Sequence, residues 1–253
     1  MTAHVANLWR WPVKGFGGEE LATVSVAPGE LFPFDRAFAI ENGPSGFAPD
    51  APVHIAKRHF VCMVHQPQTG RLSARYDETT ARLLVDTLDG RALIVDPDIP
   101  HDLEALTAEL VNHGVRGPLR LCSAEDRTGG HGFTDVPDRW ISIQNQATLD
   151  AVSEASGSTF DPRRLRANVL IAGWDAWSEE ELVGKILKLG DVQVEVAEVI
   201  NRCRAIDVNP ETAEMDRESL RTIMGLRGAR SIGLYARIMD TGTIRPGDAV
   251  HLA

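Results

Sequence analysis

Short stretches in which apolar and polar residues alternate, each bounded by glycine or proline, most constrain what this chain can fold into. Ala22, Val24 and Val26 share one parity, and the same spacing returns at 192–196 and 232–238. Successive side chains of a β-strand point to opposite faces of the sheet, so this spacing indicates strands with one buried face. Many short strands separated by glycine-rich turns favour a β-barrel or a strongly curved sheet.

Two segments show helical spacing instead. Apolar residues three and four positions apart predict a helix over 101–113, ended by Gly114, and a second helix over 145–156. Asn145 is placed to cap the second helix, and Gly157 is placed to end it. The predicted fold class is therefore α+β, mainly β, with a few short helices.

Further strands are expected where the alternation is shorter. Strand-like pieces lie around 59–65, 71–75 and 91–95, and Gly70 and Asp89-Gly90 are predicted to form hairpin turns. These pieces add to the evidence for a chain built mainly from β-structure.

The sequence also predicts one strand pairing near the end of the chain and one domain boundary near its middle. The stretch 232–238 is expected to pair with the strand that follows the turn Asp240-Thr241-Gly242. A soft change of pattern near 115–125 divides the chain, so we predict one domain at 1–120 and a second at 121–253.

The 36 acidic residues outnumber the 26 basic ones and give a formal net charge of −10. This charge disfavours nucleic acid or an anionic membrane as the main partner, although a local basic pocket could still bind a small anion. The N-terminus lacks the order of a signal peptide, and no apolar run approaches the roughly 20 residues of a membrane span. We therefore expect a soluble, cytoplasmic protein with no nucleic-acid or membrane partner.

The metal-binding residue types are sparse. Cys62, Cys122 and Cys203 are widely separated, which fits a reducing compartment better than a disulfide framework. Three cysteines are too few for a four-thiolate iron–sulfur cluster, and the eight histidines show no metal-binding spacing.

Arg36 stands at an apolar position. It shares the strand parity of Phe34, Phe38 and Ile40, where a guanidinium cannot lose its water without a partner. Either Arg36 pairs with a nearby carboxylate such as Asp35 or reaches out to water, or it binds a phosphate or carboxylate ligand.

A second set of polar side chains follows the same logic. If a strand begins at Leu165, then Arg166 and Asn168 share the face opposite Leu165 and Val169. That face is either simply solvated, or it presents guanidinium and amide donors to a phosphate or to the edge of a heterocycle.

Two glycine-rich loops carry charged residues. Lys14 ends a strand and precedes the loop 15–18, whose backbone amides and lysine could hold an anion. The loop 129–135 delivers an acidic residue, Asp135.

Cys203 lies between Arg202 and Arg204. A thiol held between two guanidinium groups should ionise more easily, and the thiolate is the form that attacks electrophiles and binds soft metals. The alternative is that Cys203 is a small, buried apolar side chain.

The ordered set of these motifs resembles the MOSC family, and in particular its members with an N-terminal β-barrel extension, which include the mitochondrial amidoxime-reducing component. The resemblance implies a MOSC β-barrel with a smaller, β-rich N-terminal domain. The matching motifs, in chain order, are Trp11-Pro12-Val13-Lys14, Phe34-Asp35-Arg36, Phe133-Thr134-Asp135, Arg166-Ala167-Asn168, Arg202-Cys203, Val208-Asn209-Pro210-Glu211-Thr212, Gly233-Leu234-Tyr235 and Gly242-Thr243-Ile244-Arg245-Pro246-Gly247-Asp248.

This resemblance implies a molybdenum cofactor (Mo-molybdopterin), with Cys203 as the metal ligand and the pterin dithiolene supplying two more sulfurs. It places Thr134 and Asp135 near the metal, with Asp135 as the expected catalytic acid beside Cys203, and it makes Tyr235 and Asn201 pocket residues. The positions that would hold the pterin and its phosphate are Lys14, Arg36, Arg166, Asn168 and Arg202.

The chain departs from the family pattern at several positions. Gly15 and Asn201 replace frequent serines, and Ile206 and Ala213 replace a frequent threonine and glycine. The first two changes remove single hydrogen bonds to a cofactor, whereas Cys203 is retained.

The function implied by the resemblance is the reduction of small N-oxygenated compounds. Because the chain ends at Ala253 without a ferredoxin-like extension, its electrons are expected from a separate donor protein of ferredoxin or cytochrome type with its reductase. One alternative is a carrier or maturation protein for the cofactor or for persulfide sulfur, and another is a noncatalytic barrel in which Cys203 is simply packed. At family level the resemblance also implies an association with pyridoxal phosphate.

Overall fold

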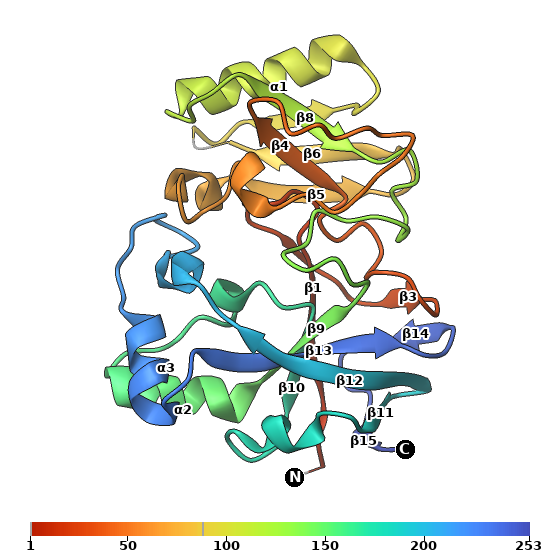
Figure 1. Cartoon of the computed structure of the whole chain (residues 1–253), viewed down its shortest axis with the longest axis vertical. Helices are drawn as coiled ribbons and strands as arrows, with labels where there is room; N and C mark the ends of the chain where they lie inside the picture. The colour runs from red at the N-terminus through yellow and green to blue at the C-terminus, as the bar shows by residue number, and fades with distance from the viewer. Residues whose placement is uncertain (1, 88) are drawn as a thin grey trace.

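Most of the alternating stretches join one large sheet. The computed structural model describes residues 2–87 and 89–253, and its largest sheet has eight strands in the order β15-β11-β12-β13-β9-β10-β1-β2 (Figure 1). In chain order these strands are β1 (His4–Arg10), β2 (Glu19–Glu20), β9 (Ile141–Asn145), β10 (Val169–Ala172), β11 (Ile186–Leu189), β12 (Val192–Asn201), β13 (Ser231–Ile238) and β15 (Val250–Leu252).

This sheet curls until its two ends meet. Its neighbouring strands are antiparallel except β9 and β10, which run parallel, and a β-bridge joins His4 to Ala249 next to β15. Apolar side chains from every second position, such as Val194 and Leu234, fill the interior and are fully buried. The prediction of a mainly β chain with a barrel-like sheet is confirmed.

The first 26 residues contribute strands to this barrel. β1 lies between β10 and β2, and β3 (Val24–Val26) pairs with β14 (Gly242–Ile244). The prediction that 232–238 pairs with the strand after Asp240-Thr241-Gly242 is therefore wrong. Both edges of β13 are already occupied by β12 and β9, so the next strand must find another partner.

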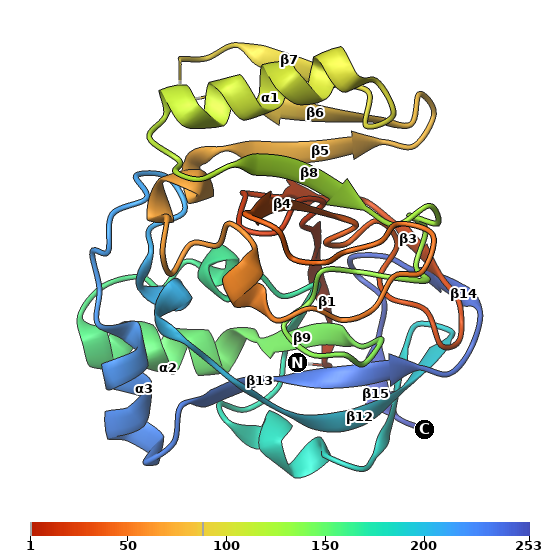
Figure 2. The ribbon, with the colours of Figure 1, turned by 45° about the horizontal axis from the view of Figure 1, so that its top comes forward.

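The upper part of the molecule in Figure 1 contains two smaller sheets and the longest helix. β4 (Phe38–Asn42) pairs with β8 (Leu119–Ser123), so β8 lies across the predicted domain boundary near residue 120. The other sheet contains β5 (Ser73–Asp77), β6 (Arg82–Asp86) and β7 (Ala92–Val95). α1 (Pro100–Asn112) runs along this sheet (Figure 2). Its Leu106 and Leu110 are buried in one cluster with residues of both smaller sheets.

The two predicted helices are confirmed. α1 matches the segment 101–113, and α2 (Gln146–Ser156) is capped by Asn145, whose side chain accepts a 3.1 Å hydrogen bond from Ala147 N. Gly157 ends α2 in the left-handed conformation, with φ of 70°. A third helix, α3 (Ser219–Arg227), was not predicted.

Several short strands are placed differently from the prediction. The segment 59–65 is not a strand: its first residue, His59, ends a 3₁₀ helix, η1 (Lys57–His59), and only Phe60 makes an isolated bridge. Gly70 lies inside a second 3₁₀ helix, η2 (Pro67–Arg71), because Pro67 fixes the first turn of this helix. The strand predicted at 71–75 begins at Ser73, whereas β7 agrees with the prediction for 91–95.

Three further 3₁₀ helices connect the strands of the barrel, and two of them flank the site described below. They are η3 (Pro162–Leu165), η4 (Ser178–Leu182) and η5 (Arg204–Asp207). Across 2–87 and 89–253, no helix is both long and apolar enough to cross a membrane.

Gly233 fixes how closely β13 approaches its neighbours. Its φ is 81°, and a Cβ atom there would lie 2.7 Å from Ile143 O and 3.0 Å from Arg202 Nη2. Only glycine combines this backbone conformation with so close an approach.

We expect Gly233→Ala to lower the free energy of unfolding by about 3 kcal/mol, because left-handed strain and a backbone clash add together. Gly228→Ala is the matched control, since Gly228 also has a positive φ of 69° but open space around it. Gly228→Ala should lower the free energy of unfolding by about 1 kcal/mol, and urea unfolding of both variants measures the difference. Equal losses would contradict the close approach at Gly233.

Candidate functional site

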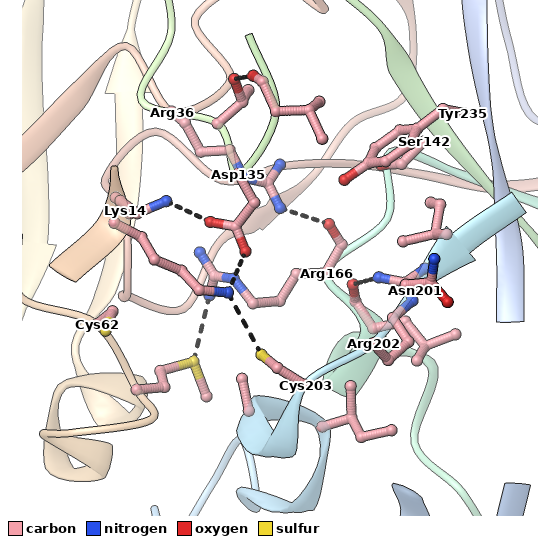
Figure 3. A pocket seen from close by; sticks show the side chains of 18 of the residues that line it. Lys14, Arg36, Cys62, Asp135, Ser142, Arg166, Asn201, Arg202, Cys203 and Tyr235 are labelled. Carbon is pink, nitrogen blue, oxygen red and sulfur yellow. Dashed lines mark hydrogen bonds and ion pairs between the residues drawn. The ribbon is translucent and has the colours of Figure 1, made fainter. Parts of the chain in front are cut away.

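A cavity of about 370 Å³ collects charged side chains from both halves of the chain (Figure 3). Its charged lining is predominantly cationic, in a protein whose net charge is −10. The cationic residues are Lys14, Arg36, Lys57, Arg164, Arg166 and Arg202, and the carboxylates are Asp35, Asp135 and Glu198. Such a concentration of positive charge attracts an anion.

Arg36 enters the cavity from a tight turn. Phe34 and Arg36 have positive φ angles of 58° and 50°, so the predicted strand across 34–40 is wrong and β4 begins only at Phe38. The alternation was misleading because Phe34 lies outside any strand and is nevertheless partly buried, packed on Tyr76 of β5 with ring centroids 4.5 Å apart.

The guanidinium of Arg36 has two acceptors. It donates to the Asp35 carboxylate, and Nη2 donates to Arg166 O at 2.7 Å. Asp35 is itself fixed by Trp11 N, which donates to Oδ1 at 2.9 Å. Arg36 thus pairs with Asp35, which was one of the two alternatives predicted from the sequence. It also lines the cavity.

Arg166 also lies in a turn. The strand predicted from Leu165 is wrong, because Pro162 begins η3, Asp161 caps it, and Arg166 ends it with φ of 52°. β10 begins only at Val169. The sequence alternation therefore placed Arg166 on a sheet face that does not exist.

The guanidinium of Arg166 is largely buried, and only some of its N–H groups have hydrogen-bond acceptors. It donates to Phe16 O and lies 4.7 Å from the centroid of the Trp11 ring. Its Nη2 atom has no hydrogen-bond partner among the residues that the structure describes. Burial, together with the nearby charge of Arg36, lowers the pKa of Arg166 to about 9, so it remains cationic at neutral pH.

Arg202 repeats this arrangement. Its Nε donates to Ile232 O at 2.9 Å and its Nη1 to Leu165 O at 2.8 Å, while Nη2 is buried without a described partner. Burial lowers the pKa of Arg202 to about 10, so this side chain also stays charged at neutral pH. The buried Nη2 groups of Arg166 and Arg202, which lack acceptors, would lower the stability of the folded protein unless a ligand accepts hydrogen bonds from them.

An alternating row of charges crosses the cavity. Lys14 Nζ donates to Phe133 O at 2.8 Å and to Asp135 Oδ1 at 2.7 Å, and Lys57 Nζ donates to Asp135 Oδ2 at 2.9 Å. Burial lowers the pKa of Lys14, an effect that Asp135 opposes. Desolvation alone would raise the pKa of Asp135, but the two ammonium groups hold it well below its usual range.

Cys203 lies at the end of this row. Lys57 Nζ lies 3.7 Å from its Sγ atom. Neither flanking arginine donates to the thiol in the described contacts: Arg202 donates to backbone carbonyls, and Arg204 lies 3.8 Å from Asp207. The cation in contact with Cys203 is therefore a lysine distant in sequence.

The remaining predicted residues line the same cavity, but most of their polar atoms have protein partners. Asn168 Oδ1 accepts from Ser142 N at 3.0 Å and from Ser142 Oγ at 2.8 Å. Thr134 Oγ1 donates to Val136 O at 2.7 Å, which holds the loop before Asp135. These two side chains stabilise the wall of the cavity.

Asn201 and Tyr235 lie toward the β12 and β13 side of the cavity (Figure 3). Asn201 Oδ1 accepts a 3.1 Å hydrogen bond from Ser231 Oγ. The Tyr235 ring lies 5.5 Å from the ring of Trp140, and burial raises the pKa of the Tyr235 hydroxyl. The structure thus brings all the predicted site residues to one cavity.

Sequence reasoning missed Lys57 and the residues that follow it. Lys57, Cys62 and Met63 line the cavity from η1 and the loop after it. The basic pair Lys57-Arg58 was the only local signal, and nothing in its spacing points to Cys203.

The ligand set for a metal is limited. No group of three or more histidine, cysteine or acidic residues could hold a metal ion in the part of the chain that the structure describes. Cys62 and Cys203 are the two cysteines in the cavity lining, so a metal bound here through Cys203 would need further ligands from a cofactor. The unpartnered guanidinium nitrogens of Arg166 and Arg202 fit the anionic part of such a cofactor.

Family models match nearly the whole chain. The MOSC N-terminal beta barrel domain matches residues 2–118 and the MOSC domain matches residues 126–251. The chain belongs to the MOSC family, as the resemblance of its motifs predicted.

Sequence relatives are molybdenum cofactor sulfurases. That of Drosophila melanogaster is 38% identical over 148 residues, which are 53% of this chain and 18% of the relative. That of Drosophila pseudoobscura pseudoobscura is 31% identical over 139 residues, covering 51% of this chain and 17% of the relative. The chain spans less than a fifth of the length of these relatives.

Similar solved structures are more distant. The YuaD protein from Bacillus subtilis aligns over 99% of this chain and 94% of its own, with 14% identity and a TM-score of 0.47. YiiM from Geobacillus stearothermophilus aligns over 45% of this chain and 53% of its own, with 20% identity and a TM-score of 0.36.

The charge row predicts a pH-dependent contribution of Asp135 to stability. Its pKa is lower in the folded protein than the usual unfolded value of about 3.9, so the stabilisation is present above that pH. It is lost as the pH falls through the folded pKa. At pH 7, Asp135→Asn should lower the free energy of unfolding by about 1–2 kcal/mol, a small value because the carboxylate is partly exposed.

Urea unfolding of the cofactor-free protein at pH 7 and at pH 3 checks this prediction. The difference between Asp135→Asn and the parent should shrink at the lower pH. Asp138→Asn, at an exposed position, is the control and should change little at either pH. A difference that grew on acidification would contradict the ion pairs of Asp135 with Lys14 and Lys57.

Proposed function

We propose that this protein binds the molybdenum cofactor in the cationic cavity, with Cys203 as the metal ligand. The observation that carries the proposal is the pair of buried, unpartnered guanidinium nitrogens of Arg166 and Arg202 in the cavity that also contains the Cys203 thiol. A pterin phosphate would give those nitrogens an acceptor, and a soft thiolate suits molybdenum.

Individual side chains have distinct roles in this proposal. Arg166 and Arg202 bind the anionic part of the cofactor, and Arg36, fixed by Asp35, adds positive charge near both. Asn168 orients Ser142 in the wall through its two accepted hydrogen bonds. Lys14 is buried and fixes Asp135, whose carboxylate lies on the Cys203 side of the cavity.

We further propose that the protein reduces small N-oxygenated compounds, such as amidoximes and hydroxylamines. Bound at Cys203, the cofactor would supply a two-electron redox centre. An N–OH group takes up two electrons and two protons, the N–O bond breaks, and the products are an N–H group and water. A separate ferredoxin- or cytochrome-type protein with its reductase supplies the electrons.

Asp135 stands beside this chemistry as a carboxylate. Because two ammonium groups hold it ionised, it has no proton of its own to give at neutral pH, and its lowered pKa makes it a weak proton acceptor. A proton that reaches the substrate through Asp135 must therefore first be taken up from solvent or from a neighbouring ammonium group.

Replacement of the thiol tests the ligand assignment. We expect Cys203→Ala to lose nearly all bound molybdenum and pterin, because it removes the thiolate assigned to the metal and no group of three or more histidine, cysteine or acidic residues in the described part of the chain could hold the metal instead. Elemental analysis and pterin fluorescence of freshly purified protein measure both. Cys122→Ala is the matched control, since Cys122 is buried in β8 away from the cavity. Retention of molybdenum by Cys203→Ala would overturn the assignment.

A second candidate function is supported by the relatives. They are named molybdenum cofactor sulfurases, and a partly exposed thiol in a cofactor pocket also suits a protein that carries the cofactor or persulfide sulfur and hands it to another enzyme. This function would use the same cavity and the same cysteine without turnover of a substrate.

Turnover separates the two functions. We expect molybdenum-loaded protein supplied with a chemical reductant to convert benzamidoxime to benzamidine, and Cys203→Ala to be inactive. Liquid chromatography of the product measures the rate. A fully loaded sample that forms no benzamidine would exclude the reductase activity and leave the carrier function.

A further inference from the structure

Lys57 makes the described hydrogen bond to the Cys203 thiol. Its Nζ atom lies 3.7 Å from Sγ and 2.9 Å from Asp135 Oδ2, as the dashed lines of Figure 3 show. Lys57 comes from η1 in the N-terminal barrel region, whereas Cys203 lies in the MOSC region. The lysine therefore joins the two regions at the end of the cavity where the metal would bind.

The Cys203 side chain has little else to fix it. The residue stands at the N-cap position of η5 but makes no capping hydrogen bond with its side chain. A cysteine side chain can occupy three staggered rotamers, and a metal needs the sulfur in only one direction. A hydrogen-bond donor at 3.7 Å favours the rotamer in which Sγ faces Lys57 and the cavity.

Lys57 is itself held in place. Its side chain is 40% exposed, as expected for a residue at the rim, but its ammonium group is bound by Asp135. Asp135 is in turn bound by Lys14, whose side chain is only 8% exposed. The partly exposed lysine is thereby tied to the interior through two ion pairs, so its position near Cys203 is defined.

We propose that Lys57 is a positioning residue that orients the Cys203 sulfur toward the metal and supplies a cation beside it. This inference rests on the proposed function, because it takes Cys203 as the metal ligand. The partners of a ligating side chain contribute strongly to metal retention, and their loss typically weakens affinity ten- to a hundredfold.

Three variants test this role. Lys57→Met removes the charge and keeps most of the chain length, Lys57→Arg keeps a cationic donor, and Lys57→Gln removes the charge with a polar end. Arg58→Met is the matched control, because Arg58 is the exposed neighbour in η1 and does not line the cavity. Each is purified as loaded protein, and molybdenum and pterin per chain are measured before and after extended dialysis.

We expect Lys57→Met and Lys57→Gln to retain roughly tenfold less molybdenum after dialysis than the parent. Lys57→Arg should retain more than either, and Arg58→Met should match the parent. The electron paramagnetic resonance spectrum of the one-electron-reduced metal provides a second readout, since a reoriented thiolate changes the signal of whatever metal remains. Thermal unfolding of the cofactor-free variants shows whether each is folded.

The outcomes separate this inference from the function on which it rests. If the parent holds no molybdenum, the proposed function fails. If the parent holds it and Lys57→Met retains as much with an unchanged spectrum, the inference about Lys57 is overturned alone. Loss in Lys57→Arg as severe as in Lys57→Met would likewise overturn it, because a cationic donor at this position would then have no effect.

Discussion

The burial of several cations around one cavity is the constraint on which this structure depends. A guanidinium that leaves water must find acceptors, and here these are mainly backbone carbonyls: Phe16 O for Arg166, Leu165 O and Ile232 O for Arg202, and Arg166 O for Arg36. These carbonyls accept hydrogen bonds from only some of the N–H groups of each guanidinium. The nitrogens left over are the ones available to an anionic ligand.

This constraint explains where the backbone departs from regular structure. Two of the three arginines have a left-handed backbone conformation, with φ of 50° for Arg36 and 52° for Arg166. Arg202 is accommodated by Gly233, whose missing Cβ leaves room for its guanidinium. Such conformations cost about 1–3 kcal/mol each and persist where the surroundings compensate for them. The irregular backbone is thus the means by which charge is aimed into the cavity.

How much of this could be predicted from the sequence depends on how local each signal is. α2 was predicted with its cap and its final glycine, because both act within one turn of the helix. The strand faces assigned to Arg36 and Arg166 were wrong. Alternation of apolar and polar residues assigns each side chain to a face only if the strand is continuous, and it does not reveal a left-handed residue that ends the strand. The convergence of the arginines with Cys203 was implied by the resemblance to the MOSC family. The position of Lys57 depends on how η1 packs, and it left no periodic signal in the sequence.

The position of β1 has a consequence for how this chain can fold. This strand belongs to the region matched by the N-terminal barrel domain, yet it pairs with β10 and is bridged to the residue next to β15, both in the MOSC region. Without it, β10 would present a row of unpaired backbone groups, the kind of edge through which proteins aggregate. Closing the barrel also requires the bridge between His4 and Ala249, a contact of large sequence separation that forms slowly because a long loop must be ordered first. β1 therefore completes its pairing only after β10 and the segment around Ala249 have been made.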